Sequence, residues 1–189
     1  LYEGIDVKGS GTVGVITYLR TDSTRISDEA DAAARSYIDS QYGENYVAES
    51  AKAVKKGQKI QDAHEAIRPT DISRTPVQIK ESLTRDQFRL YQLIWKRFAA
   101  SRMAPARYET TSVKVAAGEY AFTVSASRVA FDGFLSVYMQ EEDTKKGNVL
   151  SQSLTRGMKL KLKELKPEQH FTQPPAHYTE ASLVKTMEE

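Results

Sequence analysis

The stretch YQLIWKRFAASRMAPARYETTSVKVAAGEYAF, residues 91–122, contains the change of periodicity that decides the fold class. Before Pro105, apolar side chains recur at the spacing of an amphipathic helix. After Pro105, apolar and polar residues alternate with the period of two that is typical of a β-strand. The sequence therefore predicts an α+β chain, in which a helical part is followed by an antiparallel β part.

Two long helices are predicted before this proline. The first follows Ser27, which can cap it, and ends at Gly43. The second begins after Thr84, which forms a capping box with Gln87. A shorter helix is predicted over residues 75–83, where a threonine cap, a first-turn proline and a capping-box glutamine follow one another. The apolar stripe of the second long helix comprises Phe88, Tyr91, Ile94, Trp95, Phe98 and Ala99.

The part after the proline is predicted to be an antiparallel β module. Residues 108–138 alternate, with turn signals at Gly118 and at Asp132-Gly133. The stretch MKLKLKEL, residues 158–165, alternates again and predicts a further strand.

The bulk composition excludes several classes of protein. A net charge of +2 is too small to indicate a polyanionic partner by itself. No apolar run approaches the roughly 20 residues of a membrane helix, so a soluble protein without a membrane partner is expected. The chain has no cysteine, which excludes disulfides and thiolate metal sites.

Both ends of the sequence suggest a fragment. The chain starts without methionine. At the other end, HYTEASLVKTMEE, residues 177–189, begins a helix after Thr179 that has no C-cap, so we expect a fragment.

The first candidate site lies in GVITYLRTDSTRIS, residues 14–27. A strand is predicted over residues 11–20, and on it Tyr18 and Arg20 project to the same side as Ile16. A phenol is a poor nucleophile unless a nearby cation favours the phenolate or the attacked group is activated. Arg20 can serve either purpose, and its guanidinium matches a phosphate. The alternative is that Tyr18 only packs at the end of the strand.

The second candidate site is DAHEAIRPT, residues 62–70. On one helical turn, His64 and Arg68 lie on the same face and offer donors to one anion. Glu65 can either orient His64 or pair with Arg68. The zinc-protease pattern is excluded, because it needs a second histidine where Arg68 stands. The alternative is a local ion pair before a proline turn.

Two further clusters are better explained without a ligand. Asp28, Glu29 and Asp31 resemble a magnesium site, but acidic residues are expected in a first helical turn for capping and dipole reasons, so no metal is predicted there. Four lysines are more consistent with a solvated connector than with a phosphate-binding track. These are Lys52, Lys55, Lys56 and Lys59.

Five stretches, taken together, resemble the type IA family of DNA topoisomerases, and within it bacterial topoisomerase I. In chain order they are LYEG, GVITYLRTDSTRIS, QDAHEAIRPT, LYQLIWKRFAASRMAPA and FTQPPAHYTEASLVK. The resemblance covers essentially the whole chain, and the pairing of ITYLRTDSTR with DAHEAIRPT is its most specific part. The topoisomerase III branch is less similar, since a proline is expected there in place of Leu19.

The resemblance implies a covalent mechanism. Tyr18 matches the nucleophile that attacks a DNA phosphodiester, forms a 5′-phosphotyrosyl link and releases a 3′-hydroxyl. A second strand passes through the gap and the hydroxyl reseals the break without ATP, so that negatively supercoiled DNA is relaxed. Arg20 matches a contact to the scissile phosphate, His64 matches a phosphate-binding residue, and Arg68 is assigned to the same phosphate-binding group as a support for His64. A hydrogen-bonded loop is expected at Asp22, Ser23 and Thr24.

The resemblance also implies what lies outside the chain. Magnesium would be bound by an N-terminal toprim domain, and no cofactor or metal is expected in the fragment itself. The implied partners are single-stranded segments of supercoiled DNA, the toprim domain and a C-terminal remainder, in the cytoplasm and associated with the nucleoid. We therefore expect the fragment alone to be inactive in relaxation.

By the same resemblance, residues 1–104 form a winged-helix-like gate domain that bears the tyrosine. Residues 105–175 form part of a β arch that acts as a hinge, and residues 176–189 begin a helix of the next domain. Two other functions remain open: a non-catalytic DNA-binding or structural module, and a tyrosine recombinase. The recombinase is the weaker of the two, because its tyrosine is expected near the end of the chain.

Overall fold

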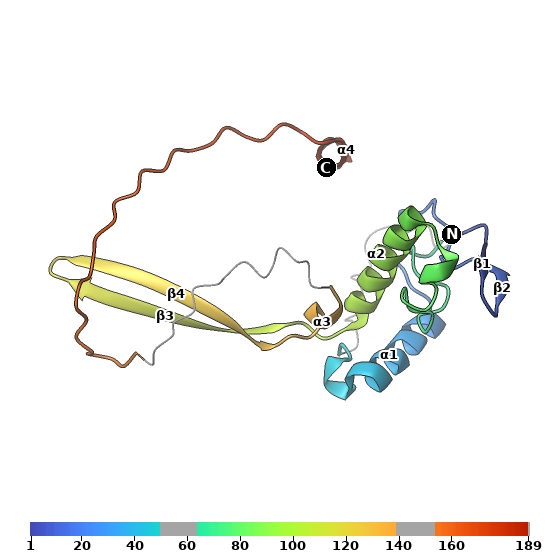
Figure 1. Cartoon of the computed structure of the whole chain (residues 1–189), viewed down its shortest axis with the longest axis horizontal. Helices are drawn as coiled ribbons and strands as arrows, with labels where there is room; N and C mark the ends of the chain where they lie inside the picture. Colours follow the sequence, from blue (N-terminus) through green and yellow to red (C-terminus); the bar gives the residue numbers. More distant parts are fainter. Residues whose placement is uncertain (50–63, 139–153, 189) are drawn as a thin grey trace. The chain divides into compact units, whose positions relative to one another are not determined.

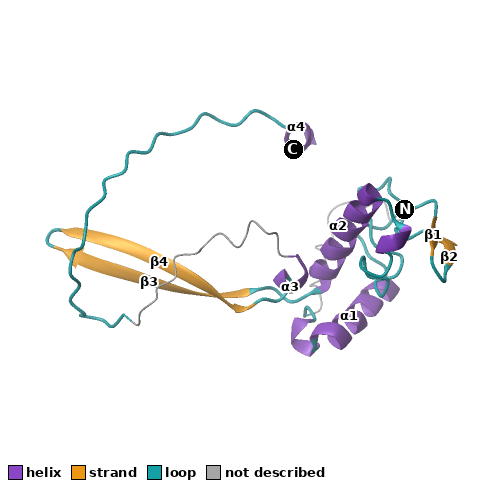
Figure 2. Cartoon of the chain, in the orientation of Figure 1, coloured by secondary structure: helices purple, strands orange, loops and turns teal. Residues whose placement is uncertain are grey.

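The structure, a computed structural model, describes residues 1–49, 64–138 and 154–188 (Figure 1). Two compact units are present, Leu1–Ser151 and Gln152–Glu189. Within the described residues, four α-helices and two two-stranded antiparallel sheets confirm the α+β class (Figure 2). No helix in these parts of the chain is long and apolar enough to cross a membrane.

The first predicted helix is confirmed as α1, Asp28–Tyr42. Ser27 caps it, since its hydroxyl accepts a hydrogen bond from the amide of Ala30 at 3.4 Å. The chain leaves the helix at Gly43, as predicted. Ala34 and Ile38 are fully buried and attach the helix to the core.

The second predicted helix is confirmed as α2, Arg85–Arg102, and both halves of its capping box are present. The predicted stripe faces the core, where Tyr91, Trp95, Phe98 and Ala99 are buried. The indole of Trp95 also donates a hydrogen bond to the carbonyl of Ile72 at 2.8 Å. α2 is therefore the main packing surface of the helical part.

The predicted short helix over residues 75–83 is wrong. Turns are followed there by a single 3₁₀ turn, η2, Lys80–Ser82. Gln78 does accept a hydrogen bond from the amide of Thr75 at 2.8 Å, so half of the capping box forms. Ile79 is buried, and its backbone has φ −104° and ψ 8°. These angles lie outside the α-helical region, so a continuous α-helix does not pass through this residue.

The strand predicted over residues 11–20 is only partly present. β1, Ile5–Val7, pairs with β2, Gly11–Val13, in an antiparallel hairpin, and β2 ends there. The next residues turn to a different partner, because Ile16 forms an isolated bridge with Pro69. Tyr18 and Arg20 therefore lie beyond the end of β2. The prediction that they project from the same face of one strand does not apply to them.

The predicted hairpin of the β part is confirmed. β3, Arg107–Ala117, pairs with β4, Tyr120–Phe131, along its full length, with the turn at Gly118 (Figure 2). The second turn signal, Asp132-Gly133, is also a turn, but it leads into the short helix α3, Leu135–Tyr138.

Gly133 is required at the base of the hairpin. Its φ is +50°, and a β-carbon there would lie 2.8 Å from the carbonyl carbon of Pro105. The amide of Phe134 donates to the carbonyl of Ala104 at 3.0 Å. The two ends of the hairpin are thus tied together where the helical part ends.

In the second unit, the predicted C-terminal helix is confirmed as α4, Glu180–Glu188, capped by the hydroxyl of Thr179. The strand predicted over residues 158–165 is wrong, since this described stretch has no regular secondary structure. An alternating pattern forms a strand only where a second strand pairs with it, and its apolar residues here are exposed. The proposed domain limits, 1–104, 105–175 and 176–189, and the winged-helix-like arrangement remain predictions.

Candidate functional site

The candidate tyrosine is positioned by contacts between two segments far apart in sequence. The hydroxyl of Thr17 donates to the carbonyl of Ala66 at 2.9 Å and accepts from the amide of Arg68 at 2.9 Å. The amide of Thr17 in turn donates to the carbonyl of Arg68 at 2.9 Å. Three hydrogen bonds thus fix the residue directly before Tyr18 against the segment that follows His64.

Two further hydrogen bonds extend this pairing. The amide of Thr70 donates to the carbonyl of Val15 at 3.0 Å, and its hydroxyl donates to the carbonyl of Gly14 at 2.9 Å. Between them, Ile16 and Pro69 are both buried. The pairing is therefore a short two-stranded element with an apolar core side.

The result is a cluster of aromatic rings around Tyr18. Its ring lies 6.0 Å from the ring of His64, with an interplanar angle of 25°. The ring of Tyr2 lies 5.4 Å away at 65°, in an edge-to-face arrangement. Tyr18 is 42% exposed, so it is accessible to a large substrate while two rings contact it. The structure thus brings together two of the predicted site residues, Tyr18 and His64.

Arg20 is exposed on the loop that follows the tyrosine. Within the described ranges no hydrogen bond or ion pair engages its guanidinium. The loop itself is ordered by Ser23, which is buried; its amide donates to the hydroxyl of Thr21 at 3.0 Å and its hydroxyl accepts from the amide of Arg25 at 3.1 Å. Ser23 fixes the loop as expected, and the role of Thr21 was missed, although serine and threonine two residues apart are typical of such turns.

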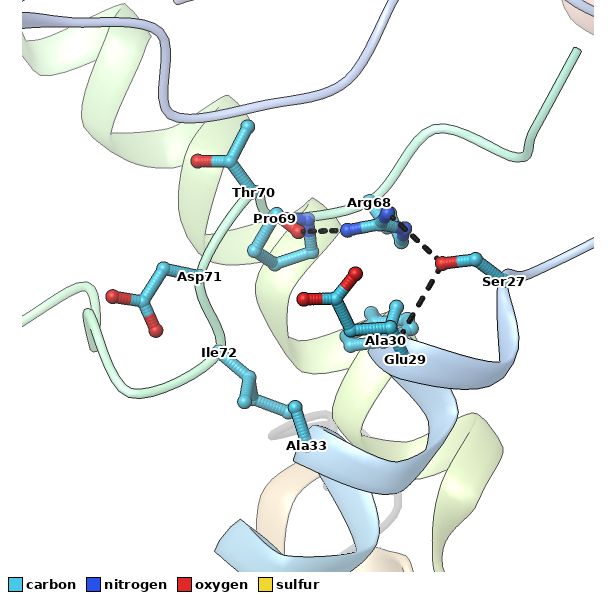
Figure 3. A pocket seen from close by; sticks show the side chains of 10 residues that line it. Ser27, Glu29, Ala30, Ala33, Arg68, Pro69, Thr70, Asp71 and Ile72 are labelled. Atoms are coloured by element: carbon cyan, nitrogen blue, oxygen red, sulfur yellow. Dashed lines mark hydrogen bonds between the residues drawn. The ribbon is translucent and has the colours of Figure 1, made fainter.

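Arg68 is directed into the protein (Figure 3). Its guanidinium donates two hydrogen bonds to one carboxylate oxygen of Glu65, at 2.7 and 2.9 Å. It also donates to the carbonyl of Pro69 at 3.0 Å and to the hydroxyl of Ser27 at 3.5 Å, and only 14% of the side chain is exposed.

The expectation that His64 and Arg68 share a helical face is wrong. Residues 64–70 are not helical, because they pair with residues 14–17 instead. Of the two roles considered for Glu65, the structure shows pairing with Arg68. Arg68 thereby connects the histidine segment to Ser27 at the start of α1.

A cavity of about 230 Å³ lies beside this arginine (Figure 3). Its walls come from the start of α1, the segment after Arg68, and Phe98 of α2. Neither Tyr18 nor His64 lines it, so the cavity is separate from the aromatic cluster. The lining residues are Ser27, Glu29, Ala30, Ala33, Arg68, Pro69, Thr70, Asp71, Ile72 and Phe98.

One acidic residue of α1, Asp31, is paired with two arginines. Asp31 accepts hydrogen bonds from Arg35 at 2.6 Å and from Arg102 at 2.9 Å. Burial alone would raise the pKa of Asp31, but the hydrogen bonds and charges of the two arginines outweigh it and lower the pKa below its ordinary value. Nowhere in the described chain do three His, Asp or Glu side chains gather as metal ligands would. Lys52, Lys55, Lys56 and Lys59 lie outside the described residues.

The chain matches known topoisomerases over its whole length. The family model described as DNA topoisomerase matches residues 1–189. The solved structure of full-length topoisomerase I from Thermotoga maritima is 38% identical, with a TM-score of 0.72 over 99% of this chain. This chain belongs to the DNA topoisomerase family, as a bacterial type IA member. It spans 29% of the length of the Thermotoga protein.

Proposed function

We propose that this chain is the part of a type IA topoisomerase that supplies the nucleophile for cutting a single DNA strand. The observation that supports the assignment best is the exposed ring of Tyr18 in contact with His64, on a segment fixed by Thr17. The phenol oxygen attacks a phosphodiester, a 5′-phosphotyrosyl bond forms, and the 3′ oxygen leaves as a hydroxyl after taking up a proton. The reverse attack reseals the strand, so the ester conserves the bond energy and no ATP is consumed.

Arg20 and His64 are assigned to contacts with the DNA phosphate. Arg20 is exposed two residues after Tyr18 and can donate a forked pair of hydrogen bonds to the phosphate oxygens, where charge develops in the transition state. His64 can donate from its ring to the same group. Arg68 is assigned to support, because its guanidinium is occupied by Glu65 and fixes the segment that contains His64.

The rest of the active site is proposed to lie outside this chain. Magnesium would be bound by an N-terminal toprim domain, and DNA would be held jointly by that domain and by a C-terminal remainder. Negatively supercoiled DNA offers the single-stranded segments that such a site needs, so we propose the bacterial nucleoid in the cytoplasm as the place of action. We expect the 189-residue chain alone not to relax supercoils.

A complementation experiment tests the proposal. The chain is mixed with the toprim domain, magnesium and an end-labelled single strand, and the reaction is stopped with denaturant. A denaturation-resistant adduct is expected with the wild type and not with Tyr18→Phe, while Tyr108→Phe, an exposed tyrosine of the hairpin, serves as the matched control. An adduct that persists in Tyr18→Phe would refute the assignment. The absence of any adduct in every mixture would favour a non-catalytic DNA-binding or structural module.

A further inference from the structure

Tyr2 contacts the ring of Tyr18 but has no assigned role. The two ring centroids are 5.4 Å apart at 65°, which is the geometry of a favourable edge-to-face pair. We propose that Tyr2 is a positioning residue, which restricts the ring of Tyr18 so that its phenol oxygen meets the scissile phosphate. This inference rests on the proposed function of Tyr18.

The structure fixes the backbone of Tyr2 directly against the tyrosine segment. The amide of Val15 donates to the carbonyl of Leu1 at 2.8 Å. One residue earlier, a β-carbon on Gly14 would lie 2.5 Å from the carbonyl oxygen of Tyr2, so any other residue at position 14 would push the two segments apart. The absence of a side chain at Gly14 is therefore what allows Tyr2 to lie beside the nucleophile.

Burial does not explain this placement. Tyr2 is 43% exposed and is not part of the core cluster, whereas its neighbour Leu1 packs against that core. An aromatic ring in edge-to-face contact with a second ring limits the rotamers that the second ring can adopt. His64 stacks on the same ring, so two contacts act on Tyr18 while its phenol end remains accessible.

An edge-to-face contact has the strength to shift a rotamer equilibrium by about two- to tenfold. Removing the ring of Tyr2 should therefore slow adduct formation by about that factor. The hydroxyl of Tyr2 is not needed for the contact, so Tyr2→Phe should behave as the wild type. Binding of the single strand should not change, because positioning acts on the reacting group and leaves the phosphate contacts in place.

The experiment uses the complemented chain described above, with a saturating labelled oligonucleotide and a rapid denaturing stop. Adduct rates and oligonucleotide affinity are compared for the wild type, Tyr2→Phe, Tyr2→Leu and the exposed control Tyr120→Leu. We expect a slower rate only in Tyr2→Leu, with affinity unchanged. A Tyr2→Leu rate equal to the wild type, or a Tyr2→Phe rate as slow as that of Tyr2→Leu, would overturn the inference.

A second measurement is independent of activity. 3-Fluorotyrosine is placed at position 18 alone and its ¹⁹F resonance is followed in the same variants. Tyr2→Leu should shift or broaden the resonance, and Tyr2→Phe should leave it nearly unchanged. A resonance that is the same in Tyr2→Leu as in the wild type would overturn the positioning role, even with no adduct in any sample. If the wild type forms no adduct but Tyr2→Leu still changes the ¹⁹F resonance as expected, the proposed function of Tyr18 is contradicted. The contact between Tyr2 and Tyr18 is then still supported.

Discussion

Thr17→Val is the substitution that most directly tests how the site is built. Valine has nearly the shape of threonine, so packing is retained while the hydroxyl is lost. The carbonyl of Ala66 then loses a donor and the amide of Arg68 loses its acceptor, both in a partly buried position. Leaving such groups unpaired costs about 1–3 kcal/mol. We therefore expect the free energy of unfolding to fall by about 2 kcal/mol, which is about a thirtyfold change in the folding equilibrium.

The assay is urea denaturation followed by the fluorescence of Trp95, the single tryptophan of the chain, which is buried in the core. Thr17→Ser keeps the hydroxyl and should recover most of the loss. Thr70→Val is the matched control, because it removes one exposed hydrogen bond to Gly14 and should cost about 0.5–1 kcal/mol. If Thr17→Val unfolds at the same urea concentration as the wild type with the same slope, the pairing of the two segments does not depend on Thr17.

Three further predictions concern the scaffold. Arg35 and Arg102 lower the pKa of the Asp31 carboxylate below its ordinary value of 3.8. The stabilisation from this carboxylate is therefore present above that ordinary value, and it is lost as the pH falls through the pKa that Asp31 has in the folded protein. Asp31→Asn should therefore be less stable than the wild type at pH 7, with a gap that narrows in acid denaturation curves below about pH 4; a constant gap would contradict this. Gly133→Ala should lower stability by about 1–3 kcal/mol, measured by thermal unfolding, because of its positive φ and the contact with Pro105; an unchanged midpoint would refute the close approach. Tyr91→Phe should cost about 1 kcal/mol, since the phenol donates to the carbonyl of Arg74 at 2.6 Å; an equal or higher stability would show that this bond contributes nothing.

The sequence predicted those elements whose signals lie within the element itself. Ser27 and the capping box of Thr84 mark the starts of α1 and α2, and Gly118 marks the turn of the long hairpin. Such signals are local, because a cap or a turn depends on residues only a few positions apart. The apolar stripe of α2 was predictable for the same reason.

The failures share a different cause, which is pairing between distant segments. Nothing within residues 14–17 shows that they pair with residues 66–70, about fifty positions later. This pairing shortened the strand predicted to reach Tyr18 and removed the helical turn on which Arg68 was to face an anion. The alternating stretch 158–165 failed likewise, because alternation does not supply a partner strand.

The sequence named candidate site residues, but it did not predict how their side chains are arranged. The family resemblance assigned the motifs that contain Tyr18 and His64 to one active site. The structure places the rings of these two residues in contact. The inward direction of Arg68 was not foreseeable, since a guanidinium in a motif can meet either a ligand or a neighbouring carboxylate. Tyr2 was missed because its motif, LYEG, has no spacing that points to Tyr18.

The proposed covalent bond between Tyr18 and DNA has a position on the protein that can be measured directly. The complemented chain is reacted with a single-stranded oligonucleotide, denatured, digested with nuclease and protease, and analysed by tandem mass spectrometry. We expect a nucleotide 5′-phosphate on the peptide that contains Tyr18, with fragment ions that assign it to that residue. A modification located on Tyr2 or on any other side chain would contradict it.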